Sequence, residues 1–568
     1  MQNKIFIEEL KRGRQQMVNN PSVAVDTFSK LNEKFPNEPE VLLSLSESFA
    51  NIGRHTEARA VAKKCLNMKM NVPLALSLSR HLTGLGMEQQ AINLAKNTYL
   101  KSGEPLGLAT KVLLTATHVC DWDLTKKITD KLLQFYKSKQ WKSCVETPRT
   151  HLLWCDDESI NNRVFQYFAN QLYPKFKNLK PLPKKIENRK IKLVYMSSDY
   201  RDHPTAQLIK GLIKEHNRDK FEIIAYDSGF DDKSTMREEI LGFFDRVVIL
   251  KDINDEEAGE LLKKEEIDVV IELNGLTNAS RMGILSTHPV PLQIGYLGFP
   301  GSVGGRFMDY IIADSYVLPE KNEKYYSEKI IRIEKTYQAN DHLNEDWPEL
   351  VHRRSYGFSE EAFILGMFNN ANKVTEEAWQ VWMQIMSSIP RSVLWMLVPN
   401  QVAQNNLKNA CIKYGIDPSR LIFAPRMSRS EHFQRMAICD VMLDPWPYGG
   451  HTTTSDALFA GIPVVTLQGN NFASRVSGGL VTASGLPGLV AENKEDYIQG
   501  VIRLSREPDL LERAKNHLKN NRLKMSIFNS KIKAEQLEAA ITLILSNRIK
   551  GIPDKNINMN YGASSDIL

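Results

Sequence analysis

The segment "GGHTTTSD", residues 449–456, combines residue types that could bind an anion. His451 and the hydroxyl run Thr452–Thr454 follow two glycines, and apolar runs flank the segment on both sides. A helix beginning here would present N–H groups that lack intrahelical partners, together with hydroxyl groups, to phosphate oxygens. We therefore predict a phosphate or diphosphate site at His451 and Thr452–Thr454.

A lysine earlier in the chain fits the same site. Lys373 lies between the apolar run "FILGM" and a helix that Thr375 would cap, and Asn369 and Asn370 precede it. The helix dipole disfavours a cation at this end, and such a departure from local rules is expected where an anion binds. None of these strand-end segments carries an Asp-x-Asp motif or a histidine cluster for a divalent metal. The pattern indicates a metal-independent nucleotide-sugar transferase.

Two strand-end segments nearer the middle of the chain could supply another side of the site. In "MSSDYRDHPTAQL" a strand ends near Asp199, and His203 precedes an amphipathic helix, where it could act as a general base or donate to a phosphate. The segment "GYLGFPGSVGGRF" places Ser302 in a glycine-rich loop whose backbone could approach an anion closely. That loop lacks the Walker lysine and the GxGxxG spacing, which disfavours a phosphate-cradling ATPase.

The elements that position these residues are predicted by the alternation of short β-rich runs with amphipathic segments. This alternation occurs in two blocks, 191–314 and 363–469. It predicts two doubly wound α/β domains. Ligands of such sheets bind beyond the carboxyl ends of the strands, and two facing sheets create a cleft. The candidate residues follow predicted strands, so we expect them at a cleft between the domains.

Residues 20–105 carry a repeat. The segments "LLSLSESFANIGRHTEARAVA" (42–62) and "ALSLSRHLTGLGMEQQAINLA" (75–95) match leucines, a glycine and alanines at an offset of 33 residues. This pattern is typical of tetratricopeptide-like helical hairpins. We interpret the three or four repeats as a docking or packing surface.

Length and composition limit the class of protein. A chain of 568 residues predicts several domains. The net charge of +6 is too dilute for a nucleic-acid footprint, so we expect no nucleic-acid partner. The six cysteines have no CxxC or ligand spacing, and no apolar stretch approaches the length of a membrane span. We therefore expect a cytoplasmic protein that does not span a membrane.

Long motifs in the second half resemble the catalytic region of the O-linked N-acetylglucosaminyltransferases, the SPINDLY-like glycosyltransferase family. They include "GFPGSVGGRFMDYIIAD", "FNNANKVTEEAWQVW", "GGHTTTSDALFAGIPVV" and "FASRVSGGLVTASGLPGLV". The resemblance covers about residues 115–545 in order. It implies a GT-B fold of two Rossmann-like lobes, preceded by an all-α tetratricopeptide-like superhelix. The implied reaction is inverting, metal-independent transfer of GlcNAc from UDP-GlcNAc to Ser or Thr hydroxyls of proteins, with no cofactor.

The resemblance also gives domain bounds. We predict repeats over 1–120, a helical junction and linker over 121–188, an N-terminal catalytic lobe over 189–355, a C-terminal UDP-binding lobe with closing helices over 356–548, and a disordered tail over 549–568. A protein or peptide acceptor could dock along the repeats.

Individual site residues follow from the same motifs. The predicted catalytic residues are His203, Lys373 and His451, although the role of the family's histidine at the position of His203 as a general base is disputed. The predicted diphosphate-binding residues are Lys373, Gly450, His451, Thr452 and Thr453, with Asn370 added as a donor-binding neighbour. The predicted uridine- and ribose-binding residues are Pro425, Met427, Arg429, His432, Arg435 and Asp456. Gly301 and Ser302 are predicted near the sugar and the acceptor.

Two departures from the family pattern leave alternatives open. Leu276 stands where many relatives have His or Tyr, and Ser302-Val303 stands where they have two hydroxyl residues. Both positions are expected near the sugar or the acceptor. The alternatives are a transferase that moves glucose from UDP-glucose to Asn, or fucose from GDP-fucose to Ser/Thr, or that uses a glycan or small-molecule acceptor. A further alternative is a non-catalytic tetratricopeptide scaffold.

Overall fold

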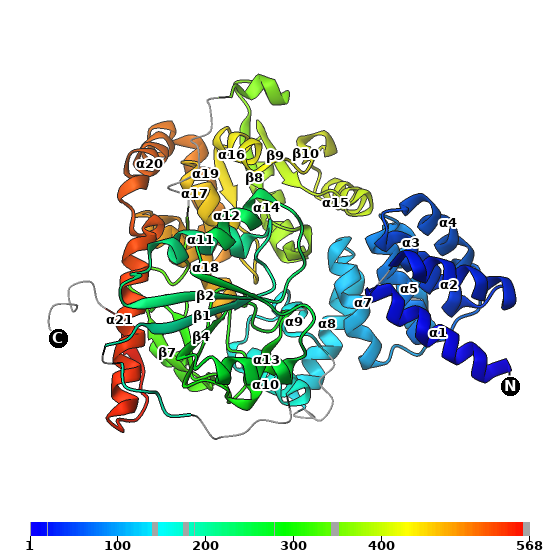
Figure 1. Ribbon diagram of the computed structural model, residues 1–568. Helices are drawn as coiled ribbons and strands as arrows, with labels where there is room; N and C mark the ends of the chain where they lie inside the picture. The colour runs from blue at the N-terminus through cyan, green and yellow to red at the C-terminus, as the bar shows by residue number, and fades with distance from the viewer. Residues whose placement is uncertain are drawn as a thin grey trace. The chain divides into compact units, whose positions relative to one another are not determined.

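The computed structural model describes residues 2–19, 21–138, 146–173, 181–186, 188–277, 279–341 and 351–559. The chain divides into two compact units, which can be followed by colour in Figure 1. One unit comprises residues 1–140 and 398–410, and the other comprises residues 141–397 and 411–568. None of the helices in the described ranges combines the length and apolarity needed to cross a bilayer.

The first unit is built of helical hairpins. Its helices are α1 (Gln2–Asn19), α2 (Pro21–Lys34), α3 (Pro39–Asn51), α4 (His55–Leu66), α5 (Val72–Gly84), α6 (Glu88–Lys101), α7 (Leu106–His118) and α8 (Trp122–Lys137). Consecutive helices pack as pairs, α3 with α4, α5 with α6 and α7 with α8. The segment 398–410, which holds most of α15 (Gln401–Lys413), belongs to the same unit.

Equivalent contacts confirm the predicted repeat. Ser46 Oγ donates to the carbonyl of Ala58 at 2.7 Å, and Ser79 Oγ donates to the carbonyl of Ala91 at 2.8 Å. Both alanines are fully buried where the two helices of a pair meet. The small side chains recur because helices that cross this closely leave no room for larger ones.

The second unit contains two parallel sheets, which confirms the predicted GT-B fold. The first lobe has strand order β14-β7-β6-β5-β4-β1-β2-β3. Its strands are β1 (Ile191–Ser197), β2 (Phe221–Asp227), β3 (Arg246–Ile249), β4 (Val269–Glu272), β5 (Leu292–Gly295), β6 (Tyr310–Ala313), β7 (Lys329–Arg332) and β14 (Ile557–Asn558). Its helices are α11 (Pro204–Glu215), α12 (Thr235–Gly242), α13 (Asp255–Lys264) and α21 (Ser530–Ile549). The central strands read as continuous apolar runs because helices cover both faces of a parallel sheet.

The second lobe has strand order β10-β9-β8-β11-β12-β13. Its strands are β8 (Phe363–Met367), β9 (Ser392–Leu397), β10 (Leu421–Ala424), β11 (Val441–Leu443), β12 (Val464–Leu467) and β13 (Val490–Ala491). Its helices are α14 (Glu376–Ser388), α16 (Arg429–Ala437), α17 (Thr452–Phe459), α18 (Phe472–Ala483), α19 (Lys494–Arg506) and α20 (Pro508–Asn521).

The C-terminal segment differs from the prediction. Helix α21, drawn red in Figure 1, packs on α11 of the first lobe, and β14 pairs in parallel with β7. Ile557 and Met559 are buried against the first-lobe core, which provides the apolar burial that this short segment lacks on its own. The predicted disordered tail is therefore wrong for residues 549–559, and the rest of it lies outside the described residues.

Candidate functional site

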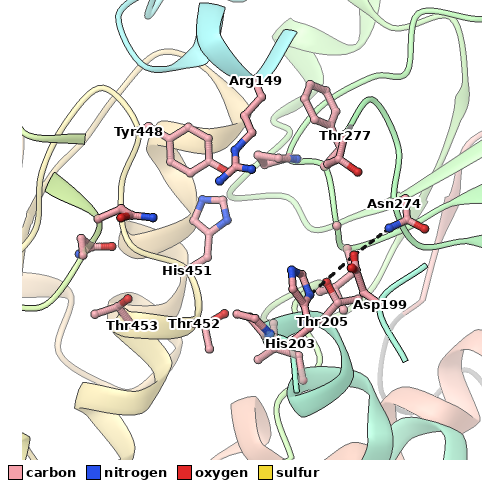
Figure 2. Close-up of a pocket in the computed structure, with 18 of the residues that line it drawn as sticks. Arg149, Asp199, His203, Thr205, Asn274, Thr277, Tyr448, His451, Thr452 and Thr453 are labelled. Atoms are coloured by element: carbon pink, nitrogen blue, oxygen red, sulfur yellow. Dashed lines mark hydrogen bonds and ion pairs between the residues drawn. The ribbon is translucent and has the colours of Figure 1, made fainter. Parts of the chain in front are cut away.

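A cavity of about 420 Å³ lies at the carboxyl ends of both sheets of the second unit. Its first-lobe wall follows β1, β4 and β5, and its second-lobe wall follows β8 and β11. A third wall comes from α9 (Pro148–Leu152), which precedes both lobes. Figure 2 shows the two lobe walls facing each other, with His451 opposite His203.

The cavity brings together several of the predicted residues. From the first lobe it takes one, His203, and from the second lobe it takes Asn370, Lys373, His451, Thr452 and Thr453. Residues that are distant in the sequence therefore meet at one place, as expected for ligand sites of open α/β sheets.

A buried carboxylate that sequence reasoning missed, Asp444, holds the glycine turn on the second-lobe wall. Gly450 N donates to Asp444 Oδ1 at 2.6 Å, and Thr466 Oγ1 donates to Asp444 Oδ2 at 2.7 Å. A Cβ added at Gly450 would lie 2.5 Å from Thr454 Oγ1, so the turn requires glycine. The signal available in the sequence was an acidic residue directly after the run "VML".

Helix α17 begins immediately after this turn. The side chain of its N-cap residue, His451, makes no capping hydrogen bond, and the first two residues of the helix, Thr452 and Thr453, line the cavity. Free N–H groups and hydroxyls at a helix N-terminus favour an anion there.

Lys373 lies against the same turn. Its Nζ donates to the carbonyl of Gly449 at 2.7 Å and lies 4.1 Å from the ring centroid of Tyr448. Burial lowers the pKa of Lys373 to about 7, Asp444 opposes this shift, and the positive charge of Arg149 adds to it. An anion bound beside Lys373 would favour the charged form of its side chain and raise this pKa.

His451 is a neutral imidazole in this structure. Its Nε2 lies 3.1 Å from the carbonyl of Ala473, which can only accept, so Nε2 carries the hydrogen. Burial lowers the pKa of His451 to about 3, and Lys373 lowers it further. The ring stacks on Tyr448 at a centroid distance of 5.2 Å. In this tautomer Nδ1 has no proton to give to a leaving group, so the contacts fit a role in ordering Tyr448 and the start of α17.

His203 caps α11 on the first-lobe wall. Thr205 N donates to His203 Nδ1 at 3.2 Å, so the hydrogen of the neutral ring is on Nε2. Burial lowers the pKa of His203, while the nearby Asp199 opposes that shift. With Nδ1 occupied, the ring can donate a hydrogen bond from Nε2 but has no free nitrogen to accept a proton.

Asp199 and Asn274 form a hydrogen-bonded pair beside this histidine. Asn274 Nδ2 donates to Asp199 Oδ2 at 2.8 Å, and Arg201 donates to Asp199 Oδ1 at 3.0 Å. The dashed lines in Figure 2 include the bond between Asn274 and Asp199. Among the described residues that line the cavity, Asp199 is the one carboxylate. Neither residue was among the predicted site residues.

The residues predicted for uridine do not line this cavity. Arg429 NH2 lies 3.3 Å from Asp456 Oδ1, and the Arg435 guanidinium donates to His432 Nδ1 at 2.8 Å and to the carbonyl of Pro425 at 2.6 Å. These residues, with Met427, lie outside the lining of the cavity, as does Gly450. Their roles in binding uridine, ribose and diphosphate stay predictions.

Ser302 and Gly301 are also absent from the cavity lining. Ser302 is fully buried, and its Oγ donates to Glu328 Oε2 at 2.6 Å. The loop turns inward at this point, so the hydroxyl is satisfied by a buried carboxylate, while the preceding Pro300 lines the cavity. The side-chain contacts of Ser302 therefore do not indicate a position near the sugar.

Comparisons with known proteins agree with this architecture. A probable UDP-N-acetylglucosamine-peptide N-acetylglucosaminyltransferase SEC from Arabidopsis thaliana is 30% identical over 64% of this chain and 38% of its own length. A UDP-N-acetylglucosamine-peptide N-acetylglucosaminyltransferase from Caenorhabditis elegans is 22% identical over 78% of this chain and 49% of its own length. The chain thus spans less than half the length of these curated relatives.

A solved structure shares the whole fold. It is a mutant O-GlcNAc transferase from Thermobaculum terrenum, with a TM-score of 0.75 and 20% identity, covering 96% of this chain and 98% of that one. The family model described as glycosyl transferase family 41 matches residues 119–350 and 344–537. Because this model matches well over half of the sequence, the chain belongs to glycosyl transferase family 41.

Proposed function

We propose that this chain is an inverting, metal-independent glycosyltransferase that moves GlcNAc from UDP-GlcNAc to Ser or Thr hydroxyls of a protein acceptor. The observation that carries the proposal is the arrangement of Lys373 beside the uncapped N-terminus of α17, across one cavity from His203. That arrangement suits a diphosphate on one wall and an acceptor hydroxyl on the other. The names of the relatives support the sugar and the protein acceptor.

The reaction exchanges one bond at the sugar. The acceptor hydroxyl oxygen bonds to C1 of GlcNAc while the bond from C1 to the β-phosphate oxygen breaks, and the electron pair leaves with UDP. The hydroxyl proton passes to solvent or to a base, and attack opposite the leaving group inverts C1. Lys373 and the first N–H groups of α17 would meet the charge that develops on the phosphate.

His203 is proposed as an orienting donor on the acceptor side. Its Nδ1 accepts from Thr205 N, so Nε2–H would point a donor at the sugar or the acceptor. We expect His203→Gln, which keeps a donor at the Nε2 position, to retain transfer within about tenfold of wild type, whereas His203→Phe loses more. If His203→Gln were as inactive as His203→Phe in initial-rate assays, a base role would be favoured instead.

The location and the acceptor site are part of the proposal. The described cysteines are buried thiols with no disulfide among them, which supports a reducing compartment such as the cytoplasm. The acceptor protein would dock along the repeats of the first unit.

The proposal is tested by incubating the protein with UDP-GlcNAc, UDP-glucose or GDP-fucose and a cell lysate, followed by mass analysis of the modified residues. We expect HexNAc on Ser and Thr with UDP-GlcNAc alone. Glucose on Asn or fucose on Ser/Thr would reject the proposed donor, and no UDP binding at all would favour a non-catalytic scaffold.

A further inference from the structure

The third wall of the cavity comes from a segment predicted to be only a junction and linker. Arg149 and Leu153, in and beside α9, line the cavity together with the two lobes. Figure 2 shows the Arg149 side chain extending from α9 toward Tyr448 and His451. An arginine therefore reaches the site from outside both Rossmann-like lobes.

Hydrogen bonds on both sides of α9 fix its position. Glu146 accepts from His151 Nδ1 at 2.8 Å and from Trp154 Nε1 at 2.7 Å, which ties the start of the segment to the end of α9. Asp156 accepts from Asn470 N at 3.0 Å, which ties the following residues to the second lobe. Arg149 therefore lies on a helix whose position is held by hydrogen bonds to neighbouring segments.

Glu158, at the start of α10 (Glu158–Leu172), joins the same segment to both lobes. It accepts from Tyr326 Oη at 2.6 Å in the first lobe, and it pairs with Arg475 of the second lobe at 3.1 Å. The carboxylate is almost completely buried. Because a buried ion pair of this kind is costly to break, the segment that carries Arg149 keeps one position relative to both walls.

Arg149 and Arg201, two arginines that line the cavity, differ in whether a carboxylate pairs with them. Arg201, which also lines the cavity, is paired with Asp199 at 3.0 Å. Within the described part of the chain no carboxylate pairs with Arg149, and the side chain is exposed to the cavity. The planar guanidinium carries five N–H donors in a fixed arrangement that matches the oxygens of a phosphate group.

We propose that Arg149 binds the diphosphate of the nucleotide donor and stabilises the negative charge that UDP gains as the sugar leaves. This inference rests on the proposed function for the presence of a diphosphate. Arg149 forms and breaks no covalent bond, and its planar guanidinium suits two phosphate oxygens at once. The Arg149 side chain extends toward Tyr448 and His451, on the wall that also holds Lys373 and the start of α17, which favours the diphosphate over an acidic residue of the acceptor.

The test compares nucleotides that differ in their phosphates. Calorimetry would give the affinity of Arg149→Met for UDP, UMP and uridine, with Arg163→Met as a control, since Arg163 is an exposed residue of α10 outside the cavity lining. We expect Arg149→Met to weaken UDP binding by about 10- to 100-fold, with uridine unchanged. We expect Arg163→Met to bind all three like wild type. With UDP-GlcNAc as donor, kcat should fall for Arg149→Met while the acceptor KM stays constant.

Wild-type affinity of Arg149→Met for UDP, with a raised KM for acidic acceptors, would overturn the proposal and assign Arg149 to the acceptor. If Arg149→Met does not fold, as judged by its thermal melt, Arg149→Gln carries the same expectation. The affinity for UDP is measured without transfer of the sugar. If wild type binds UDP but does not transfer GlcNAc, the proposed function is rejected, and the UDP affinity of Arg149→Met still tests the role of Arg149. Binding of GDP but not UDP would reject the proposed donor, and the comparison of GDP with guanosine would then test Arg149.

Discussion

On each lobe a buried carboxyl group holds a glycine turn at the cavity wall, but the charges beside the two carboxyl groups differ. On the second lobe Asp444 accepts from Gly450 N at 2.6 Å, and on the first lobe Glu272 accepts from Gly275 N at 2.6 Å. Both carboxyl groups are buried at the end of a central strand, and each fixes a glycine turn that the cavity needs. The backbone geometry of the two walls is therefore stabilised in the same way.

The neighbours of the two carboxyl groups differ. Burial raises the pKa of Asp444 to about 6, and the nearby Lys373 lowers it, so the carboxylate is ionised at neutral pH. Burial raises the pKa of Glu272 to about 8, and Asp199 raises it further, so this carboxyl keeps a proton at neutral pH. Asp444 thus favours the charged form of Lys373, which can meet a phosphate, and the first-lobe wall avoids a second negative charge beside Asp199.

The strongest test of this contrast removes the cation. We expect Lys373→Met to lower kcat by about 10²- to 10³-fold, because Lys373 would stabilise charge that appears mainly in the transition state. The measurement is the initial rate at saturating UDP-GlcNAc. Lys494→Met is a control, since Lys494 is a half-exposed lysine paired with Glu377 away from this cavity. Equal loss in both variants would show that the effect is not local to the cavity.

The second test changes the glycine turn. We expect Gly450→Ala to lose about 1–3 kcal/mol of folding free energy and most of its UDP binding, because the added methyl group would meet Thr454 and Asp444 inside a packed turn. Gly242→Ala is the matched control, since a Cβ at Gly242 meets nothing within 4 Å. Denaturant unfolding and UDP titration measure the two effects. If Gly450→Ala bound UDP with unchanged affinity, the geometry of this glycine turn would not be needed for UDP binding.

The third test uses pH. In the free protein the pKa of Lys373 is lowered to about 7, and a bound diphosphate would raise it. The affinity for UDP-GlcNAc should therefore be constant below pH 7 and fall by up to about tenfold per pH unit above it. Calorimetry in buffers of different ionisation enthalpy should detect proton uptake on binding near pH 8. Lys373→Arg should bind without that uptake, and a wild-type affinity that is flat to pH 9 would contradict the role of Lys373.

The smallest effect is expected on the first lobe. Because the pKa of folded Glu272 is raised above its unfolded value, its contribution to stability is complete at low pH and is lost as the pH rises through about 8. We expect Glu272→Gln, which cannot ionise but has only one acceptor for the N–H groups of Asn274 and Gly275, to melt below wild type at pH 4. That difference should shrink as the pH rises from about 4.5 to about 8, because only the wild type loses stability over this range. A difference in melting temperature that stays constant from pH 4 to pH 9 would contradict the raised pKa of Glu272.

The sequence predicted those features that depend on local pattern. Alternating strands and helices gave both sheets, and the 33-residue offset gave the helical hairpins with their buried alanines. Lys373, His451 and His203, which line the cavity, were singled out because each lies in a polar stretch between an apolar run and a predicted helix. Ligand sites of open sheets lie at those strand ends, so position alone was informative.

The features that were missed depend on contacts between distant segments. Arg149 carries no local signal, because its place in the cavity is set by the bonds of Asp156 and Glu158 to residues far along the chain. The buried contact of Ser302 is likewise absent from the local pattern, since its partner Glu328 lies 26 residues further along the chain. The strand β14 was missed because two residues acquire β structure only from the edge that they join.

The return of the chain to the first lobe has a consequence for motion and for truncation. The chain passes to the second lobe between β7 and β8 and comes back after α20 to place α21 and β14 on the first lobe. The lobes are therefore connected covalently twice, so a movement of one lobe against the other acts on both connections. A fragment that ends before α21 would not shorten the second lobe. It would remove Leu537 and Ile541 of α21, which are buried in the intact chain, and uncover the apolar surface of the first lobe that packs against them.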